Sequence, residues 1–547
     1  MKFLANLIGL CLIVNFNISQ TQGTLYLDDV KAQEGYTLIA PLNYDTTYLV
    51  NNCGEVINKW ASSYPPGDEV FLTDQGNLWR AGRTTGINLV GAGGRGGIIE
   101  LFDWDGNILW SYERCDQFEC MHHDFRLLPN GNLLILIWDK YEKNIAVNNG
   151  ANPDSITTNG VWSEYLVEIT PVIGHHDSAL TVWEWHAWDH LVQDYNNVLP
   201  NYGSIGQSPE RIDINYAQHL DEDWLHINGI DYNSSLDQII MSVPTFDEFW
   251  IIDHSTTTAQ AVGSSGGNSG KGGDLLYRWG NPMAYQSGTI SDKQLFFQHN
   301  PHWVPGNKLF GDKIILFNNN NEEGGNLRSS VFVIDPQTDI NGNYLMNAAN
   351  QYLPDSPFYQ YDLPTDLFST KVSGVQVQDN DNLLICAGTN GTLLEIDNSE
   401  DEVWKYKSPV SPPNIILSQD SVGISNWVFR AYKYTNDFPG FTGKDMTPGL
   451  PIELNSNRSY CNIVSLNENY ESSFILYPNP ALSYITVESK KLIEKALIYN
   501  LNGHLVLQES LINKNKIDIG NLTQGFYFIT FFDGDVKLGK TVKIHKQ

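Results

Sequence analysis

Histidine is the residue type with which this sequence could do chemistry, and several histidines recur in comparable surroundings. His122 and His123 lie in MHHDFRLLPNGNLLIL, His226 lies in DEDWLHINGIDYN, and His299 and His302 lie in FFQHNPHWVP. Each segment precedes a predicted inner strand, so the three segments occupy the same place in a repeat. Histidines that converge from equivalent positions can bind a metal ion or act on an anionic group.

Other interpretations of these histidines stay open. A histidine beside tryptophan in a β-protein is often a core residue whose hydrogen bonds are satisfied. Although Asp124 and Asp223 could contribute ligands, the sequence contains no HxH or HExxH element. We therefore expect no metal and no other cofactor. His254 follows a strand in IIDHSTTT, where hairpin-turn chemistry accounts for it. The remaining histidines of this region lie in a less repeat-like insertion: His175, His176, His186 and His190.

A repeat of strands must position these residues. In each unit an apolar strand ends in a turn and leads to a second strand that closes on an aromatic residue. Turns such as Asp105-Gly106 and Asn130-Gly131 are typical of hairpins. Six such units predict an all-β fold, a six-bladed β-propeller over residues 24–470, whose loops gather at one end of a central channel. The closing aromatics are Trp60, Trp110, Trp185, Trp279, Tyr361 and Trp404.

The overall composition narrows the class of protein. The chain has 547 residues with 33 basic and 63 acidic side chains, a formal net charge of −30 at pH 7. Nucleic acid and anionic lipid both attract basic surface, so we expect neither as a partner. Hydrophobic residues make up 41% and aromatic residues 12%, which is enough to build a large core.

The N-terminus predicts export. Lys2 precedes a mostly apolar run from Leu4 to Phe16, the layout of a secretory signal peptide, which we place at residues 1–22. No later apolar run is long enough for a membrane span, so we expect no integral membrane segment in the mature chain. Export permits disulfides, and Cys115 and Cys120 could form a small loop-closing bridge or remain unpaired thiols.

The C-terminal residues 474–547 form a separate predicted domain. Short alternating strands with turn residues between them predict a small Ig-like β-sandwich. The strings YPNPALSYITV, YNLNGHLV, LTQGFYFI and KTVKI resemble the C-terminal sorting domain of the type IX secretion system of Bacteroidetes. The resemblance implies that the chain meets the type IX secretion machinery and is secreted or displayed at the cell surface. An ordinary Ig-like accessory module is the alternative.

The motifs of the larger region also match a family. HHDFRLLPNGNLL, DWLHINGIDYN, FWIIDHSTTT, LLYRWGNP, QHNPHW and LFNNN, in that order, resemble the aryl-sulfate sulfotransferases. These are exported bacterial enzymes that move a sulfuryl group between phenols without a nucleotide donor. The family fold is a six-bladed β-propeller. The resemblance therefore implies the same architecture that the repeat predicts.

The family mechanism implies a role for each matched residue. A histidine attacks the sulfur of a phenolic sulfate ester and forms a sulfohistidine, from which a second phenol takes the group. Neutral imidazole is a good nucleophile near pH 7, and the sulfuryl oxygens need cationic or hydrogen-bonding partners. By motif His299 falls on the nucleophile, His226 on a second functional histidine and His123, preferred over His122, on a third. We expect substrate contacts from His122, His302 and Arg278.

One departure from the family weakens the prediction of activity. The family commonly has an arginine that grips the sulfate where this sequence has Val243 and Pro244. Arg278, Arg328 and Lys271 are the candidates for a replacement cation. A catalytically inactive surface propeller that binds an aromatic or carbohydrate ligand is therefore a second hypothesis. A quinone- or metal-dependent propeller dehydrogenase is a third, against which the absence of a recognisable metal-binding motif counts.

Overall fold

The computed structural model divides the chain into two compact units, Met1–Tyr460 and Cys461–Gln547. It describes residues 20–547 except 43, 86–92, 218–221, 324–325, 457–460, 462–473, 490–492, 501–503, 513 and 534–535. The predicted signal peptide of residues 1–22 thus lies almost wholly outside the described residues. Within them, α-helix is confined to α1 (Lys143–Asn148) and α2 (Thr258–Ala261). The predicted all-β class is confirmed.

Six antiparallel sheets of four or five strands make up most of the described part of the first unit. The first sheet joins β29 (Val428–Tyr434), β2 (Tyr36–Pro41), β3 (Thr46–Asn51) and β4 (Val56–Ala61). The second sheet joins β5 (Pro66–Leu72), β6 (Leu78–Arg83), β7 (Gly97–Phe102) and β8 (Ile108–Glu113). The third sheet joins β9 (Glu119–Leu127), β10 (Leu133–Tyr141), β11 (Val161–Pro171) and β12 (Ala179–His186). The fourth sheet joins β15 (Gly229–Asn233), β16 (Gln238–Val243), β17 (Glu248–Asp253) and β18 (Tyr277–Trp279). The fifth sheet joins β19 (His299–Trp303), β20 (Ile314–Glu323), β21 (Asn326–Ile334) and β22 (Tyr359–Asp362). The sixth sheet joins β23 (Gly374–Val377), β24 (Leu383–Ala387), β25 (Thr392–Ile396), β26 (Glu402–Lys407) and β1 (Gly23–Leu27). Two short pairs accompany them, β13 (Leu191–Val192) with β14 (Ile212–Asp213) and β27 (Val410–Ser411) with β28 (Ile415–Ile416).

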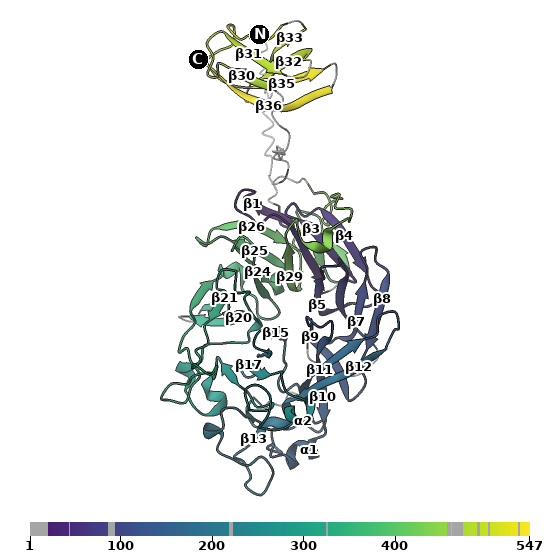
Figure 1. Cartoon of the computed structure of the whole chain (residues 1–547), viewed down its shortest axis with the longest axis vertical. Helices are drawn as coiled ribbons and strands as arrows, with labels where there is room; N and C mark the ends of the chain where they lie inside the picture. The colour runs from purple at the N-terminus through teal and green to yellow at the C-terminus, as the bar shows by residue number, and fades with distance from the viewer. Residues whose placement is uncertain are drawn as a thin grey trace, which may run out of the picture. The chain divides into compact units, whose positions relative to one another are not determined.

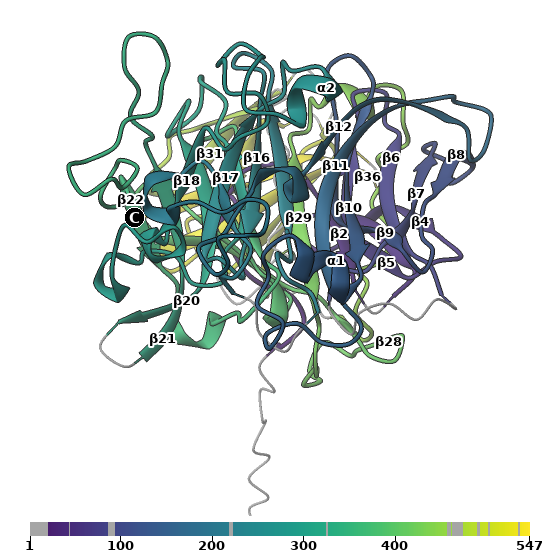
Figure 2. The ribbon, with the colours of Figure 1, turned by 90° about the horizontal axis from the view of Figure 1, so that it is seen from below.

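The inner strands, which are β5, β9, β15, β19, β23 and β29, close a ring. Each contacts the inner strand of the next sheet, and β29 contacts β5. Figure 1 shows β5, β9, β15 and β29 around the middle of this unit, and Figure 2 shows β10 and β11 of one sheet side by side. The ring is closed by hydrogen bonds between β29 from the end of the unit and β2 from its start, with Tyr434 opposite Tyr36.

The histidines lie closer to the ring than the sequence predicted. LLIL, IIMSV and IILF, which we expected to form or lead the inner strands, belong to β10, β16 and β20, the second strands of their sheets. The quoted apolar runs lie in the middle of their sheets, where both faces of the strand are buried. The inner strands face the middle of the ring, where polar residues gather, so their sequences lack an apolar run.

Each aromatic residue that was expected to close a unit lies on the fourth strand of a sheet. Trp60, Trp110 and Trp404 are fully buried. Their indole N–H groups donate to backbone carbonyls of the next sheet: Trp60 to Asp103 at 2.8 Å, Trp404 to Asn52 at 2.8 Å. Because a buried indole needs a hydrogen-bond partner, these bonds join neighbouring sheets while the rings fill the space between them. Trp185 and Trp279 donate in the same way, to Gly273 and Pro354.

His254 joins the third and fourth sheets through two carboxylates. Its Nε2 lies 2.9 Å from Glu168 and its Nδ1 lies 2.7 Å from Asp237. Burial lowers the pKa of His254, but the hydrogen bonds to Glu168 and Asp237 outweigh it and the pKa is raised overall. The protonated histidine therefore stabilises the fold. This contribution is complete below the pKa of an unfolded histidine, about 6.5, and is lost as pH rises through the higher folded value.

We expect a His254→Gln variant to lose more stability at pH 6 than at pH 9. Tryptophan fluorescence in urea measures this for the first unit alone, because all 15 tryptophans precede Cys461. The exposed His175 gives a matched His→Gln control that should not change the unfolding midpoint at either pH. An equal loss at both pH values would contradict the proposed charge on His254.

The second unit has two antiparallel sheets with a common apolar core. One sheet joins β30 (Phe474–Tyr477), β31 (Tyr484–Ser489) and β34 (Lys516–Asp518). The other joins β33 (Leu505–Ser510), β32 (Lys495–Tyr499), β35 (Gly525–Asp533) and β36 (Val536–Lys546). Ile485 and Ile517 of the first sheet pack with Ile498 and Ile529 of the second. Alternation of apolar and polar residues along each strand produces this core.

Two further sequence predictions concern cysteines and membrane spans. Cys115 and Cys120 form a disulfide, so the loop-closing bridge is confirmed. Cys386 is a buried free thiol. In the described part of the chain, no helix combines the length and the apolar character needed to cross a membrane.

Candidate active site

Strained backbone marks the points where the inner strands enter the ring. Asp68 (φ 92°), His123 (φ 44°) and Asn300 (φ 57°), on β5, β9 and β19, have left-handed conformations. So do His226 (φ 50°) and Ser373 (φ 93°), which lie just before β15 and β23. For residues other than glycine this costs about 1–2 kcal/mol each. Such strain interrupts the alternation of a strand, which is why two consecutive residues, His122 and His123, can both face one site.

His122, His123 and His226, which we call the histidine cluster, meet where β9 and the segment before β15 enter the ring. The Nε2 atoms of His123 and His226 are 3.3 Å apart. The ring centroid of His122 lies 4.3 Å from that of His123 and 5.1 Å from that of His226. One ring nitrogen from each histidine lies within 4.8 Å of the other two. The structure thus brings together three of the six predicted site residues.

A carboxylate lies behind each histidine of the cluster. Asp68 Oδ2 is 2.7 Å from Nδ1 of His123, and Glu164 Oε1 is 3.3 Å from Nδ1 of His122. Asp223 accepts a short hydrogen bond from Nδ1 of His226 and a second, at 3.0 Å, from the indole of Trp138. Burial raises the pKa of Asp68 to about 7. It also raises the pKa of Glu164 well above its ordinary value.

Burial favours the neutral form of two histidines of the cluster, His122 and His123. Burial, followed by repulsion from the other histidines, lowers the pKa of His122 and of His123 well below the usual range. His122 is stacked on Trp138 with ring centroids 3.6 Å apart. Gly94 packs against His123 so closely that a Cβ there would lie 2.0 Å from Nε2. Trp138 and Gly94 therefore pack closely against two of the three histidines.

His299 stands at the start of β19, beside the cluster but outside it. The ring of Phe297 contacts both, with its centroid 6.0 Å from that of His299 and 6.3 Å from that of His226. Nδ1 of His299 donates to Asn319 Oδ1 at 2.8 Å, and Nε2 accepts from the backbone N–H of Val372 at 3.0 Å. Burial and then the proximity of His123 lower its pKa well below the usual range. His299 is thus a neutral imidazole with its lone pair on Nε2.

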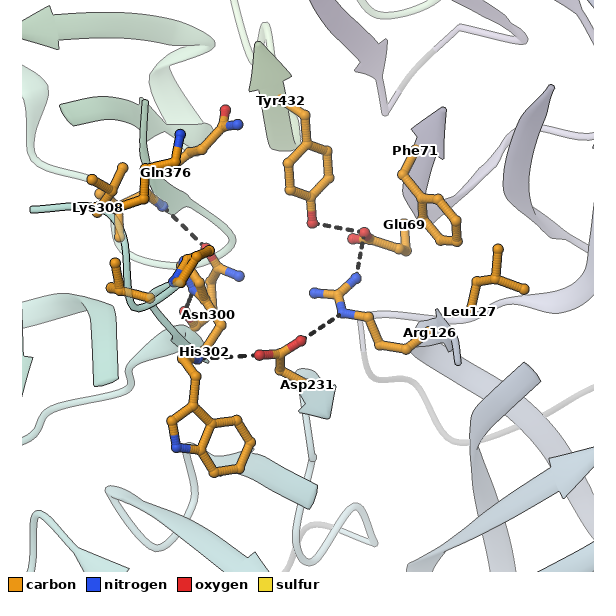
Figure 3. A pocket seen from close by; sticks show the side chains of 15 residues that line it. Glu69, Phe71, Arg126, Leu127, Asp231, Asn300, His302, Lys308, Gln376 and Tyr432 are labelled. Carbon is orange, nitrogen blue, oxygen red and sulfur yellow. Dashed lines mark hydrogen bonds and ion pairs between the residues drawn. The ribbon is translucent and has the colours of Figure 1, made fainter. Parts of the chain in front are cut away.

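His302 lies apart from the cluster, in a cavity of about 430 Å³ at the other ends of the inner strands. Figure 3 shows Glu69, Arg126, Asp231, His302 and Tyr432 around this cavity. Nδ1 of His302 donates to the carbonyl of Asn300 at 3.0 Å, and burial lowers its pKa to about 4. Aromatic rings also line the cavity, those of Phe71 and Trp303 as well as Tyr432.

Arg278 and Arg328, two of the candidate cations, contact other groups. Arg278 is fully buried on β18, where it bonds to Glu248 and to the carbonyls of Pro209 and Arg211. These contacts give it a structural role at the edge of the fourth sheet, and it borders neither the cluster nor the 430 Å³ cavity. Arg328 pairs with Asp362 at 3.6 Å on the fifth sheet. Val243, where the family has arginine, is buried in an apolar core.

A layer of buried charges crosses the ring between the cluster and the cavity. Arg430 of β29 lies 2.9 Å from Glu69 and 2.8 Å from Asp124. Arg126 bonds to the same Glu69 at 2.6 Å and lies 3.6 Å from Asp231. Asp124, which the sequence offered as a possible metal ligand, is therefore engaged with arginines. The two arginines thus link residues of four inner strands: β29, β5, β9 and β15.

Sequence reasoning missed several residues that the structure places at the site. Asn319 belongs to the LFNNN motif, which carried the family resemblance but received no role. Asp68, Glu164 and Arg430 belong to no motif that was singled out. A signal did exist for Arg430: in VFRAYKY it is a lone arginine on the buried face of a strand, and a buried arginine requires carboxylate partners.

Comparison with known sequences supports these assignments of family. The Arylsulfotransferase (ASST) family model matches residues 94–411, more than half of the chain. The Secretion system C-terminal sorting domain model matches residues 475–545. No curated protein sequence matches the chain.

Comparison with solved structures gives low overall similarity. A protein of unknown function from Bacteroides caccae is 10% identical, with 74% of this chain and 99% of that chain covered and a TM-score of 0.37. A catalytically inactive virginiamycin B lyase from Staphylococcus aureus is 12% identical, with 63% of this chain and 70% of that chain covered and a TM-score of 0.28. These TM-scores are too low to transfer architecture or activity.

Both resemblances seen in the sequence are confirmed. The sorting domain indicates secretion to the cell surface or beyond by the type IX machinery. The match over residues 94–411 includes the histidine cluster, His299 and His302. The chain therefore belongs to the arylsulfotransferase family.

Proposed function

We propose that this protein moves a sulfuryl group from a phenolic sulfate ester to a phenol through a sulfohistidine, without a nucleotide. The observation that carries the proposal is the state of His299. Asn319 holds its hydrogen on Nδ1, which leaves the Nε2 lone pair for attack. His123 and His226 are close enough to influence the pKa of the same histidine, so a group bound at Nε2 lies within their electrostatic reach.

The proposed reaction has two displacements. First, Nε2 of His299 forms a bond to sulfur while the sulfur–oxygen bond to the donor breaks, and the phenolate leaves with that electron pair. Then the oxygen of the acceptor phenol attacks sulfur, its proton passes to the medium, and Nε2 regains its lone pair. The backbone N–H of Val372 must leave Nε2 for the first step. Because this N–H group remains near Nε2, it can then donate a hydrogen bond to a sulfuryl oxygen, as preorganised amides do where negative charge develops.

The architecture that we propose for this activity is a six-bladed β-propeller of residues 24–470. Each of the six sheets is one blade, and the ring of inner strands supports this count. Residues 474–547 form an Ig-like sorting sandwich, and residues 1–22 a signal peptide. His226 and His123 act with His299 in this proposal, while His122 contributes to sulfate binding at the same end of the ring.

The decisive assay is release of 4-nitrophenol from 4-nitrophenyl sulfate by the purified protein, with and without added phenol. Phenol is expected to increase the rate, because it removes the sulfuryl group from His299 and regenerates the enzyme. Release at the same rate without phenol would assign the chain to sulfate hydrolysis instead. No release from several aryl sulfates by folded protein would reject the proposed transfer.

A second candidate function is binding of an aromatic or carbohydrate ligand without chemistry. Two observations favour it: Val243 and Pro244 replace the sulfate-gripping arginine, and the 430 Å³ cavity combines rings with Arg126 and Asp231. Such a mixture of apolar rings and polar groups suits small organic ligands. Calorimetry with phenols and monosaccharides tests this function, and a Trp303→Ala variant should abolish the heat. Binding that is unchanged in this variant would exclude the cavity as the binding site.

A further inference from the structure

The Nε2 atoms of His123 and His226 face each other inside the histidine cluster, 3.3 Å apart. Nδ1 of His226 donates to Asp223, so this nitrogen carries a hydrogen. Nδ1 of His123 lies 2.7 Å from Asp68 without the geometry of a hydrogen bond. One cation between the two Nε2 atoms would contact both rings.

The spacing of the nitrogens matches a metal ion of the zinc type. Imidazole nitrogens bind tetrahedral Zn²⁺ at about 2.0–2.1 Å, which separates two ligands by about 3.3 Å. His122 supplies a third nitrogen within 4.8 Å of the other two. Three histidines with a fourth position open to substrate are a common arrangement for a catalytic zinc ion.

The groups around the cluster fit the same ion. Metal-binding histidines usually direct their second nitrogen to a carboxylate, which fixes the ring and increases its basicity. Asp68, Asp223 and Glu164 occupy these positions. His122 is 1% exposed, and neither of its ring nitrogens makes a hydrogen bond of good geometry. A buried imidazole in that state is costly unless something binds it.

We propose that His122, His123 and His226 hold a divalent zinc-type ion, which takes the place of the missing sulfate-gripping arginine. The ion would attract the sulfuryl oxygens while Nε2 of His299 attacks sulfur; this role rests on the proposed function, whereas metal binding does not. The inference reverses the expectation of no metal. In the sequence, the adjacent His122 and His123 and the distant His226 form no recognisable metal-binding motif. The three ligands meet only because two sheets converge.

The test is metal binding by the full chain. Protein treated with chelator is titrated with Zn²⁺ against a coloured competitor, and with Co²⁺, whose visible spectrum reports four-coordinate nitrogen ligation. We expect one equivalent per chain. His123→Ala and His226→Ala should each weaken binding by more than 100-fold, and Asp223→Asn, which disturbs only the partner of His226, by about 10–100-fold. His254→Gln, remote from the cluster, should keep full affinity.

The outcomes separate the metal site from the transferase activity. No stoichiometric binding by the wild type, or binding equal in wild type and His226→Ala, overturns the proposed site even if sulfuryl transfer is observed. Stoichiometric binding that the cluster variants lose establishes the site even if no aryl sulfate is turned over. If a variant fails to fold, the Co²⁺ spectrum of the wild type still tests the proposed site. Spectral bands of six-coordinate cobalt would overturn the proposed site.

Discussion

A His299→Ala variant is expected to lose sulfuryl transfer by at least about 1,000-fold in kcat/KM, which corresponds to about 4 kcal/mol of transition-state stabilisation. Alanine removes the atom to which the sulfuryl group is bound in the proposed intermediate. Neither water nor a neighbouring side chain replaces a covalent nucleophile that Asn319 has fixed in one tautomer. The measurement is release of 4-nitrophenol from 4-nitrophenyl sulfate with saturating phenol.

Two further variants show whether His299 acts as the nucleophile or only supports the fold. Asn319→Ala leaves the nucleophile but frees its tautomer, so kcat should fall less than in His299→Ala while KM changes little. His175→Ala, at an exposed position, controls for the loss of any histidine. Mass spectrometry of protein quenched with donor alone should find one sulfuryl group on the peptide that contains His299. A sulfuryl group on His226 or His123 instead would refute the assignment.

The sequence predicted the outer parts of each sheet better than the inner parts. Trp60, Trp110 and Trp404 could be placed at the ends of repeating units because a buried ring close to a turn is a local pattern. The inner strands carry His, Asn and Asp residues that face the ring, and no periodicity marks them. The apolar second strands were therefore mistaken for them.

The sequence could identify the histidines of the site but not the groups that contact them. His123, His226 and His299 could be named because each belongs to a motif that recurs or resembles the family. The partners that decide their chemistry come from other sheets: Asp68 from β5, Glu164 from β11 and Val372 from the segment before β23. No spacing within the chain links these residues. Tautomer, accessibility and the close approach of two Nε2 atoms are properties of the folded ring.

An Arg430→Leu variant is expected to lower the free energy of unfolding of the first unit by about 3–5 kcal/mol, the usual cost of removing one partner from a buried ion pair. Arg430 is 3% exposed and its Nη1 reaches both Glu69 and Asp124, whose side chains have no exposed surface. Leucine would leave Asp124 with the backbone N–H of Ile230, at 2.9 Å, and the more distant Arg126, at 3.3 Å. Urea unfolding followed by tryptophan fluorescence reports on this unit alone, because the second unit has no tryptophan.

Charge, rather than lost volume, should dominate this effect, and a double variant separates the two. Asp124→Asn combined with Arg430→Leu removes the orphaned negative charge, so the double variant should be more stable than Arg430→Leu alone. Arg328→Leu breaks a half-exposed pair with Asp362 and should change stability by less than about 1 kcal/mol. A double variant as unstable as the sum of its parts would mean that Arg430 acts through packing, and that the charged layer does not hold the inner strands together.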